Sequence, residues 1–125
     1  MVIGIGTDII EVERVNRAYS RWGERFLRRV YTPAERSYCL KKANAACCFA
    51  GRFAAKEAVL KALGTGHKGS GFGEVEVTND DAGKPLVILR GRAAAVAREK
   101  GVSAVHLSIS HDAAHAVAFA VTEKI

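Results

Sequence analysis

The chain has 125 residues, of which 49% are hydrophobic and 26% charged, and its formal net charge is +6. This length suits one domain with a core of useful size, so we expect a single domain over residues 1–125. No apolar run reaches membrane-spanning length and the first residues do not read as a signal peptide, so we expect a cytoplasmic protein. The basic excess predicts an anionic partner: nucleic acid, a membrane surface, a phosphorylated small molecule or an acidic protein.

The three cysteines, Cys39, Cys47 and Cys48, are an odd number, and two of them are adjacent. No C-x-x-C pair or Cys/His spacing accompanies them, which argues against a zinc site and against a disulfide framework. We therefore expect reduced cysteines that act as small hydrophobic residues.

The first predicted element is a strand over 2–9, where the residue types alternate. One face carries Gly4, Gly6 and Asp8, and the other carries Ile3, Ile5, Thr7 and Ile9. A face with two glycines has no side chains to cover it, so backbone or a ligand must pack there. Asp8 is then either part of a binding site or the N-cap of the following helix.

Three helices are predicted in the first half of the chain. The first covers 11–22, is interrupted at Gly23 and should bury Val12, Val15, Tyr19 and Trp22. Thr32-Pro33-Ala34-Glu35 is a capping box with proline at the first helical position, which predicts a short helix to about Lys41. Asn44 can cap a longer helix over 45–63, which ends at Gly64.

Between Arg14 and Arg29 the chain has six arginines and a single acid, Glu24. Exposed faces usually mix charges, so a docking surface for an anionic partner is favoured over a solvated basic helix. Arginine also suits bidentate binding of carboxylate or phosphate. The pattern leaves open whether that partner is nucleic acid or an acidic protein, although the aromatic residues lie on the apolar stripe, where they are poorly placed to stack on bases.

The predicted helix over 45–63 is apolar enough to lie in the core, yet it contains charged residues. Ala50, Ala54, Glu57 and Lys61 lie along one stripe. The alanines let another surface approach closely, and the carboxylate and ammonium beside them suit a metal-bound or phosphate-bearing ligand. The alternative is a surface ion pair between Glu57 and Lys61, which this helix alone favours because such pairs are common.

In the second half of the chain the spacing of apolar residues changes from a helical period to the alternation typical of strands. The glycine-rich segment 64–71 follows a helix C-terminus, where the dipole end is negative, so we interpret it as a C-cap and loop and not as a phosphate loop. Beyond it we expect a helix over 92–100 and strands over 74–78, 86–90, 105–110 and 116–122. This order predicts an α+β fold, with helices mainly in the N-terminal half packed on a mostly antiparallel sheet.

Two further groups of polar residues could carry chemistry. His106, Ser108 and Ser110 share one strand face, which is either half-exposed or a polar floor under a nucleotide. Asp8 and Glu57 are carboxylates on glycine- and alanine-lined surfaces, and such a pair can hold one Mg²⁺ together with substrate phosphates and water. The sequence alone does not show that these two residues meet.

With these residues in view, the chain resembles the holo-[acyl-carrier-protein] synthases, which are small bacterial 4′-phosphopantetheinyl transferases. The resemblance covers essentially the full length and rests on Gly4-Ile5-Gly6-Thr7-Asp8-Ile9, on residues 51–66, and on Leu107-Ser108-Ile109-Ser110-His111. The middle segment is the most specific of the three. The resemblance implies the 4′-phosphopantetheinyl transferase fold.

The resemblance also implies an activity used in fatty-acid biosynthesis. The 4′-phosphopantetheine group of coenzyme A moves to a serine of apo acyl carrier protein, and adenosine 3′,5′-bisphosphate leaves. Asp8 and Glu57 would ligate Mg²⁺, and Lys61 would neutralise charge on the transferring phosphoryl group. The serine proton would go to Glu57 or to a nearby water, and these alternatives stay open.

Further roles follow from the same resemblance. Coenzyme A would contact Arg52, Lys61, Gly64, Thr65, Gly66, Lys41 or Lys42, Pro85 and His106. The acidic carrier protein would dock on Arg14, Arg21, Arg25, Phe26 and Arg28. The family implies a homotrimer with sites between protomers, and no nucleic-acid or membrane partner. The competing hypotheses are a basic nucleic-acid-binding module, which would not need Asp8 or Glu57, and an interaction protein that binds no coenzyme A.

Overall fold

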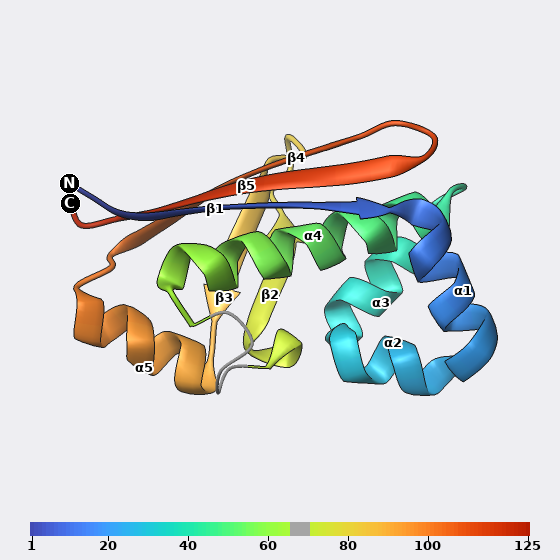
Figure 1. Ribbon diagram of the computed structural model, residues 1–125, viewed down its shortest axis with the longest axis horizontal. Helices are drawn as coiled ribbons and strands as arrows, with labels where there is room; N and C mark the ends of the chain where they lie inside the picture. The colour runs from blue at the N-terminus through green and yellow to red at the C-terminus, as the bar shows by residue number, and fades with distance from the viewer. Residues whose placement is uncertain (66–70) are drawn as a thin grey trace.

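Helix α4 (Ala45–Leu63) lies beneath a sheet and is the element that the other helices and strands surround (Figure 1). The computed structural model describes residues 1–65 and 71–125. The remaining elements, in chain order, are β1 (Val2–Glu11), α1 (Val12–Trp22), α2 (Glu24–Val30), α3 (Pro33–Leu40), the 3₁₀ turn η1 (Phe72–Glu74), β2 (Val75–Asn79), β3 (Pro85–Leu89), α5 (Gly91–Lys100), β4 (Ala104–His111) and β5 (His115–Glu123).

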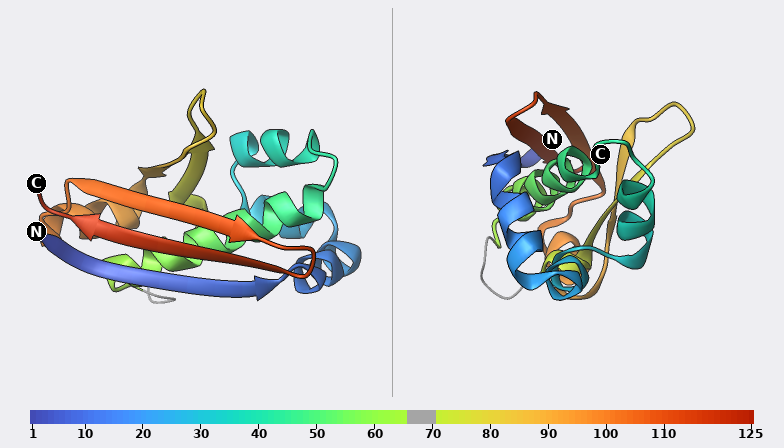
Figure 2. Two further views of the ribbon diagram at one scale, coloured as in Figure 1. Left: turned by 90° about the horizontal axis from the view of Figure 1, so that it is seen from above. Right: turned by 90° about the vertical axis from the view of Figure 1, so that its right-hand side faces the viewer.

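The strands form two antiparallel sheets. One has the order β1-β5-β4, and the other is the hairpin of β2 and β3. Figure 2 shows the three long strands side by side over α4, with α1, α2 and α3 gathered at one end. The hairpin contacts α4 through β2 and the larger sheet through β3. The predicted α+β fold, with helices packed on antiparallel strands, is confirmed.

Strand β1 packs directly on the backbone of α4, as its glycine face requires. A Cβ atom on Gly6 would overlap the carbonyl oxygen of Ala58, and one on Gly4 would overlap that of Ala62. Both alanines are buried. Backbone therefore covers the glycine face, and the close approach needs small residues on the strand and on the helix.

The helix boundaries follow the capping signals. Both halves of the capping box between Thr32 and Glu35 are formed at the start of α3. The Asn44 side chain accepts a hydrogen bond from the Cys47 amide at 3.1 Å, and Gly64 ends α4 in the left-handed conformation with φ of 81°. These three predictions are confirmed.

The predicted buried stripe of α1 is only half correct. Val12 and Val15 are buried, whereas Tyr19 and Trp22 are exposed. The Arg21 guanidinium lies 5.0 Å from the centroid of the Trp22 ring. Periodicity identifies the apolar face of a helix. How much of that face is covered depends on the neighbouring elements, which do not extend over the last turn of α1.

The expectation of three reduced cysteines is wrong for two of them. Cys39 and Cys48 form a disulfide that joins the end of α3 to the first turns of α4. The turn between the two helices brings their Cα atoms to 5.4 Å, within bridging range, and spacing rules do not reveal this folding back. Cys47 is free and buried, as expected.

In the described residues no helix is long and apolar enough to cross a lipid bilayer.

A buried ion pair links α3 to α4. The Lys56 Nζ and Glu35 Oε1 atoms are 2.7 Å apart, and both side chains are inaccessible to solvent. Lys56 also donates to the carbonyls of Phe72 and Val75, and Glu35 accepts from the Val77 amide at 2.8 Å. Burial lowers the pKa of Lys56, while the Glu35 carboxylate acts to raise it. The pair therefore fixes α3, α4 and β2 relative to one another.

The glycine–helix contact makes a testable prediction. Gly6→Ala should lower the free energy of unfolding by about 2–3 kcal/mol, because the added methyl group pushes two backbones apart. Gly73→Ala is the matched control, since no heavy atom lies within 4 Å of its Cβ position. We expect the control to change stability by less than about 0.5 kcal/mol in urea unfolding. Equal effects of the two substitutions would contradict the packing described above.

Candidate functional site

The first candidate site lies along the contact between β1 and α4. Lys61 Nζ is 3.4 Å from Asp8 Oδ1 and donates to the Thr7 carbonyl at 2.9 Å. Glu57 precedes Lys61 by one helical turn, so it projects from the same side of α4. We call Asp8, Glu57 and Lys61 the carboxylate–lysine site.

The register of β1 on α4 explains how these residues reach one another. Gly4 faces Ala62 and Gly6 faces Ala58, so the strand and the helix run in opposite directions. The next residue on the inward face, Asp8, must lie over the preceding turn of the helix. Asp8 is not an N-cap, because Glu11 occupies that position before α1.

Two alternatives for Glu57 can be compared with its environment. A solvated surface pair needs exposure, but Glu57 is only 7% exposed. The Lys61 side chain is about half exposed and donates to the Thr7 carbonyl and to Asp8 on β1. Glu57 is therefore a largely enclosed carboxylate, whereas the ammonium of Lys61 reaches the surface.

The donors suit a hard cation that shares its coordination with a substrate. Carboxylate oxygens are the ligands that Mg²⁺ prefers, and one or two of them often suffice when phosphates and water supply the rest. Within residues 1–65 and 71–125 no group of three or more His, Cys, Asp or Glu side chains lies together. Asp8 and Glu57 thus fit such a shared site and not a closed protein cage.

The second candidate site is a cavity of about 440 Å³ between α3, the start of α4, the β2–β3 hairpin and β4. Of the residues expected to contact coenzyme A, Lys42, Arg52 and Pro85 line it. Sequence reasoning did not single out Tyr38 and Asn79, which also line it, because no local pattern marks them. We call this space the Arg52 cavity.

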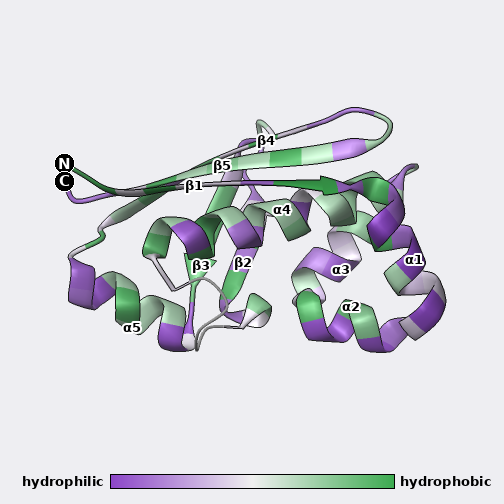
Figure 3. Cartoon of the chain, viewed as in Figure 1, coloured by the Kyte–Doolittle hydropathy of each residue, from purple (hydrophilic) through white to green (hydrophobic). Residues whose placement is uncertain are grey.

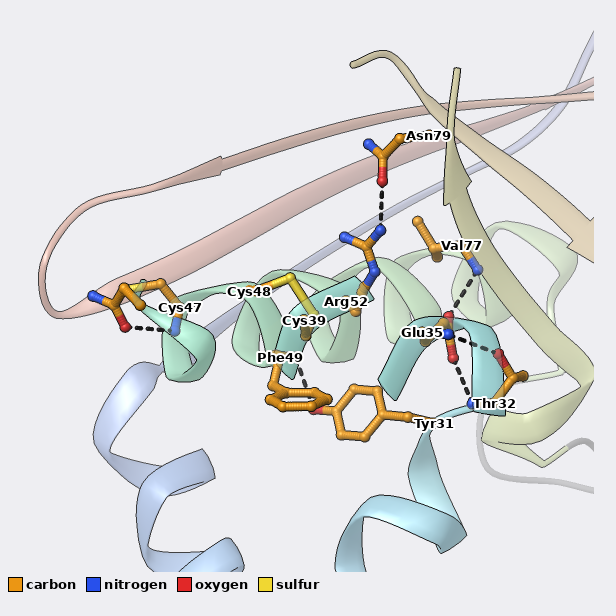
Figure 4. Close-up of a disulfide and its surroundings, with 11 residues drawn as sticks. Tyr31, Thr32, Glu35, Cys39, Cys47, Cys48, Phe49, Arg52, Val77 and Asn79 are labelled. Atoms are coloured by element: carbon orange, nitrogen blue, oxygen red, sulfur yellow. Dashed lines mark hydrogen bonds between the residues drawn. A yellow bond between two sulfur atoms is a disulfide. The ribbon is translucent and has the colours of Figure 1, made fainter. Parts of the chain in front are cut away.

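Arg52 is the most unusual side chain of this cavity, being only 5% exposed. Its Nη2 donates to Asn79 Oδ1 at 2.5 Å, and its guanidinium lies 4.2 Å from the centroid of the Tyr38 ring. Figure 4 shows the side chain pointing from α4 toward Asn79, beside the Cys39–Cys48 disulfide. Burial lowers the pKa of Arg52, and interactions with Tyr38 and Glu35 oppose that shift.

The donors of Arg52 are not all used. Its Nε atom is buried and has no hydrogen-bond partner. An arginine stays protonated in proteins, and buried donors are normally paired. A buried cation with spare donors beside an open cavity is suited to bind an anion.

Other predicted contacts lie elsewhere. Lys41 is the exposed C-cap of α3, and it is not among the described residues that line the Arg52 cavity. His106 is on the outward face of β4, with Nε2 at 2.8 Å from Glu123 Oε1, whereas His111 lines the cavity. Gly64 and Thr65 follow α4 beyond Lys61, and Gly66 lies outside the described residues. One chain therefore does not gather all these residues.

Four of the expected docking residues are exposed arginines at one end of the molecule. Arg14, Arg21, Arg25 and Arg28 lie on α1, which Figure 3 shows as largely hydrophilic, and on α2, where hydrophilic and hydrophobic residues alternate. Phe26 is partly buried and lines a hollow of about 370 Å³ together with Trp22, Arg25 and Arg29. The surface thus offers positive charge around a small apolar depression.

The sequence of this chain is similar to that of proteins from one enzyme family. Residues 4–120 match the 4′-phosphopantetheinyl transferase superfamily. The holo-[acyl-carrier-protein] synthase of Halothermothrix orenii is 50% identical over 124 residues, which cover 99% of this chain and 99% of that protein.

Two solved structures are also similar. The crystal structure of the holo-[acyl-carrier-protein] synthase of Neisseria meningitidis has a TM-score of 0.92 and 37% identity, covering 99% of this chain and 100% of that one. The Bacillus anthracis synthase in complex with CoA (3′,5′-ADP) has a TM-score of 0.82 and 41% identity, covering 100% and 99%. The chain therefore belongs to the holo-[acyl-carrier-protein] synthase family of 4′-phosphopantetheinyl transferases.

Proposed function

We propose that this protein transfers the 4′-phosphopantetheine group of coenzyme A to a serine hydroxyl of apo acyl carrier protein. The bond from the phosphopantetheine phosphorus to the adenosine bisphosphate oxygen breaks, a bond from the same phosphorus to the serine oxygen forms, and adenosine 3′,5′-bisphosphate leaves. The supporting observation is the carboxylate–lysine site, where Lys61 Nζ lies 3.4 Å from Asp8 Oδ1 and Glu57, only 7% exposed, precedes Lys61 by one helical turn.

Each residue of that site has a separate task. Asp8 and Glu57 would hold Mg²⁺, which would polarise the pyrophosphate as a Lewis acid. Lys61 is 3.4 Å from Asp8, and its half-exposed ammonium would turn an N–H donor toward a phosphoryl oxygen. The serine proton goes either to Glu57 or to a water that Glu57 orients.

Coenzyme A would use the Arg52 cavity for its nucleotide end. Arg52 and Lys42 supply positive charge there, and Pro85 closes one wall. Gly64 and Thr65, with Gly66 next in the sequence, would contact coenzyme A through their backbone beyond the end of α4. His106 would contribute from the outward face of β4 of another protomer.

The basic surface of α1 and α2 would bind the acidic carrier protein. Its arginines are exposed and carry charge of one sign, so they can steer an acidic helix toward the site. Phe26 and the depression beside it would receive an apolar side chain of the partner.

A homotrimer is part of the proposal. Ile5, Ile9 and Phe119 are 74%, 66% and 57% exposed on the face of the sheet opposite α4. Exposed apolar patches of this kind mark interaction surfaces. The role in fatty-acid biosynthesis and the cytoplasmic location expected from the sequence stay predictions.

The activity can be tested by intact-mass analysis of apo acyl carrier protein incubated with the enzyme, coenzyme A and Mg²⁺. The wild type should add a phosphopantetheinyl group, and chelation of the metal should stop it. Glu57→Gln should reduce turnover about 100-fold or more while the protein stays folded, because a metal ligand and proton acceptor is lost. Glu99→Gln on α5 is the matched control. Full activity of Glu57→Gln would contradict the role given to Glu57.

The docking surface makes a second prediction. The double variant Arg14→Glu and Arg21→Glu should raise KM for the carrier protein about 10-fold or more at low salt, with a smaller effect at high salt. KM for coenzyme A should change little. The double variant Arg92→Glu and Arg98→Glu, on α5, controls for the same change in net charge. Equal loss of affinity for both substrates would show that the two binding surfaces are not separate.

The assembly makes a third prediction. Light scattering after gel filtration should give three times the chain mass of 13.4 kDa. Phe119→Asp should dissociate the trimer, since it buries a charge in the apolar contact. Leu86→Asp, at another exposed apolar position, should leave the mass unchanged. A monomeric wild type would refute the trimer.

A further inference from the structure

Arg52 is held by contacts that leave its position little freedom. Asn79 at the end of β2 accepts from Nη2, and the Asn79 amide itself donates to the Gly83 carbonyl at 3.0 Å. Tyr38 of α3 covers one face of the guanidinium, with 4.2 Å between the guanidinium carbon and the ring centroid. Elements distant in sequence thus fix one side chain, and Figure 4 shows its bond to Asn79.

Tyr38 is itself anchored. The next residue, Cys39, is bonded to Cys48, which lies one turn before Arg52 on α4. Lys42 adds a second cation on the ring, with Nζ 4.5 Å from the Tyr38 centroid. Tyr38 therefore contacts two cations that both line the Arg52 cavity. These contacts place two positive charges at one wall of the cavity, and Glu35, which interacts electrostatically with Arg52, is not among the described residues that line it.

An arginine fixed in this way is prepared for an anion. A mobile arginine side chain loses conformational entropy when it binds an anion. If the protein already holds the side chain in place, binding no longer carries this entropic penalty. The unpaired Nε atom shows that its donors are not exhausted by the protein. The planar guanidinium favours a bidentate partner such as a phosphate.

The chemistry of coenzyme A indicates which phosphate is bound. Its pyrophosphate reacts, so it must lie at the carboxylate–lysine site. The 3′-phosphate on the ribose takes no part in the transfer and needs a separate cationic contact. The Arg52 cavity is separate from the carboxylate–lysine site, since no residue of that site lines it.

We propose that Tyr38 and Asn79 are positioning residues, which hold Arg52 against the 3′-phosphate of coenzyme A and make the enzyme select coenzyme A over 3′-dephospho-coenzyme A. This inference rests on the proposed function for its substrate. A purely structural role, in which Arg52 only ties α4 to the hairpin, is the competing explanation.

The test compares the two substrates in steady-state transfer. Asn79→Ala should raise KM for coenzyme A roughly 10-fold with kcat little changed, because a hydrogen bond that orients a charged group is lost. KM for 3′-dephospho-coenzyme A should stay at its wild-type value. Tyr38→Leu should behave in the same way, and Asp81→Ala in the same hairpin is the matched control.

A double-mutant comparison separates positioning from structure. Arg52→Gln should remove most of the preference for coenzyme A, and adding Asn79→Ala to it should cause no further loss. Equal losses with both substrates, or additive losses in the double variant, would overturn the inference in favour of the structural role.

Binding of the nucleotides alone makes the result independent of the transfer reaction. By calorimetry, the wild type should bind adenosine 3′,5′-bisphosphate more tightly than 5′-AMP, and Asn79→Ala should lose that difference. If the wild type transfers no phosphopantetheine, yet prefers adenosine 3′,5′-bisphosphate and Asn79→Ala loses that preference, the proposed function fails and the positioning role stands. If transfer is normal and the variants bind both nucleotides as the wild type does, only the positioning role fails.

Discussion

The close approach of β1 to α4 is the constraint on which the candidate site depends. Gly4 and Gly6 allow the strand to touch the helix carbonyls. The alanines on that side of α4 have small side chains, which leave room for the strand backbone. The contact fixes the register of the strand, because a shift by one residue would turn isoleucines toward the helix. With the register fixed, Asp8 lies over the turn before Ala58, where the long side chain of Lys61 reaches its carboxylate. The same small residues that form the core contact therefore place the reacting groups.

A second constraint acts from the other side of α4. The buried pair of Lys56 and Glu35 joins α3 and β2 to the helix, and removing one partner of such a pair is strongly destabilising. Tyr38 lies one turn beyond Glu35 on α3, and Asn79 lies two residues beyond Val77 on β2. The ion pair thus sets the distance across which both residues reach Arg52. The buried ion pair of Lys56 and Glu35 therefore also positions the two residues that hold Arg52 in its cavity.

Local signals were sufficient for most elements but not for their contacts. Capping residues and glycine stops give the ends of α3 and α4 directly from the sequence. The disulfide, by contrast, depends on how α3 folds back on α4. Arg52 and Lys56 offered an unused signal: two like charges four residues apart on an apolar helix are unfavourable unless each has its own partner. Those partners, on α3 and the hairpin, are remote in sequence and are found only by folding the chain.

The geometry of α4 also gives a reason for assembly. Arg52 and Glu57 are five residues apart, so their side chains project about 140° apart around the helix axis. The sheet covers the sector on one side between them, with Ala54 and Ala58 beneath its strands. A ligand that needs both the carboxylate–lysine site and an Arg52 cavity is more simply bound where these two flanks come from different copies of the chain. The exposed isoleucines and Phe119 on the opposite face of the sheet supply the apolar surface that such packing requires. Packing of several copies of the chain would thus account for two features. The two sites lie apart within one chain, and one face of the sheet is left uncovered.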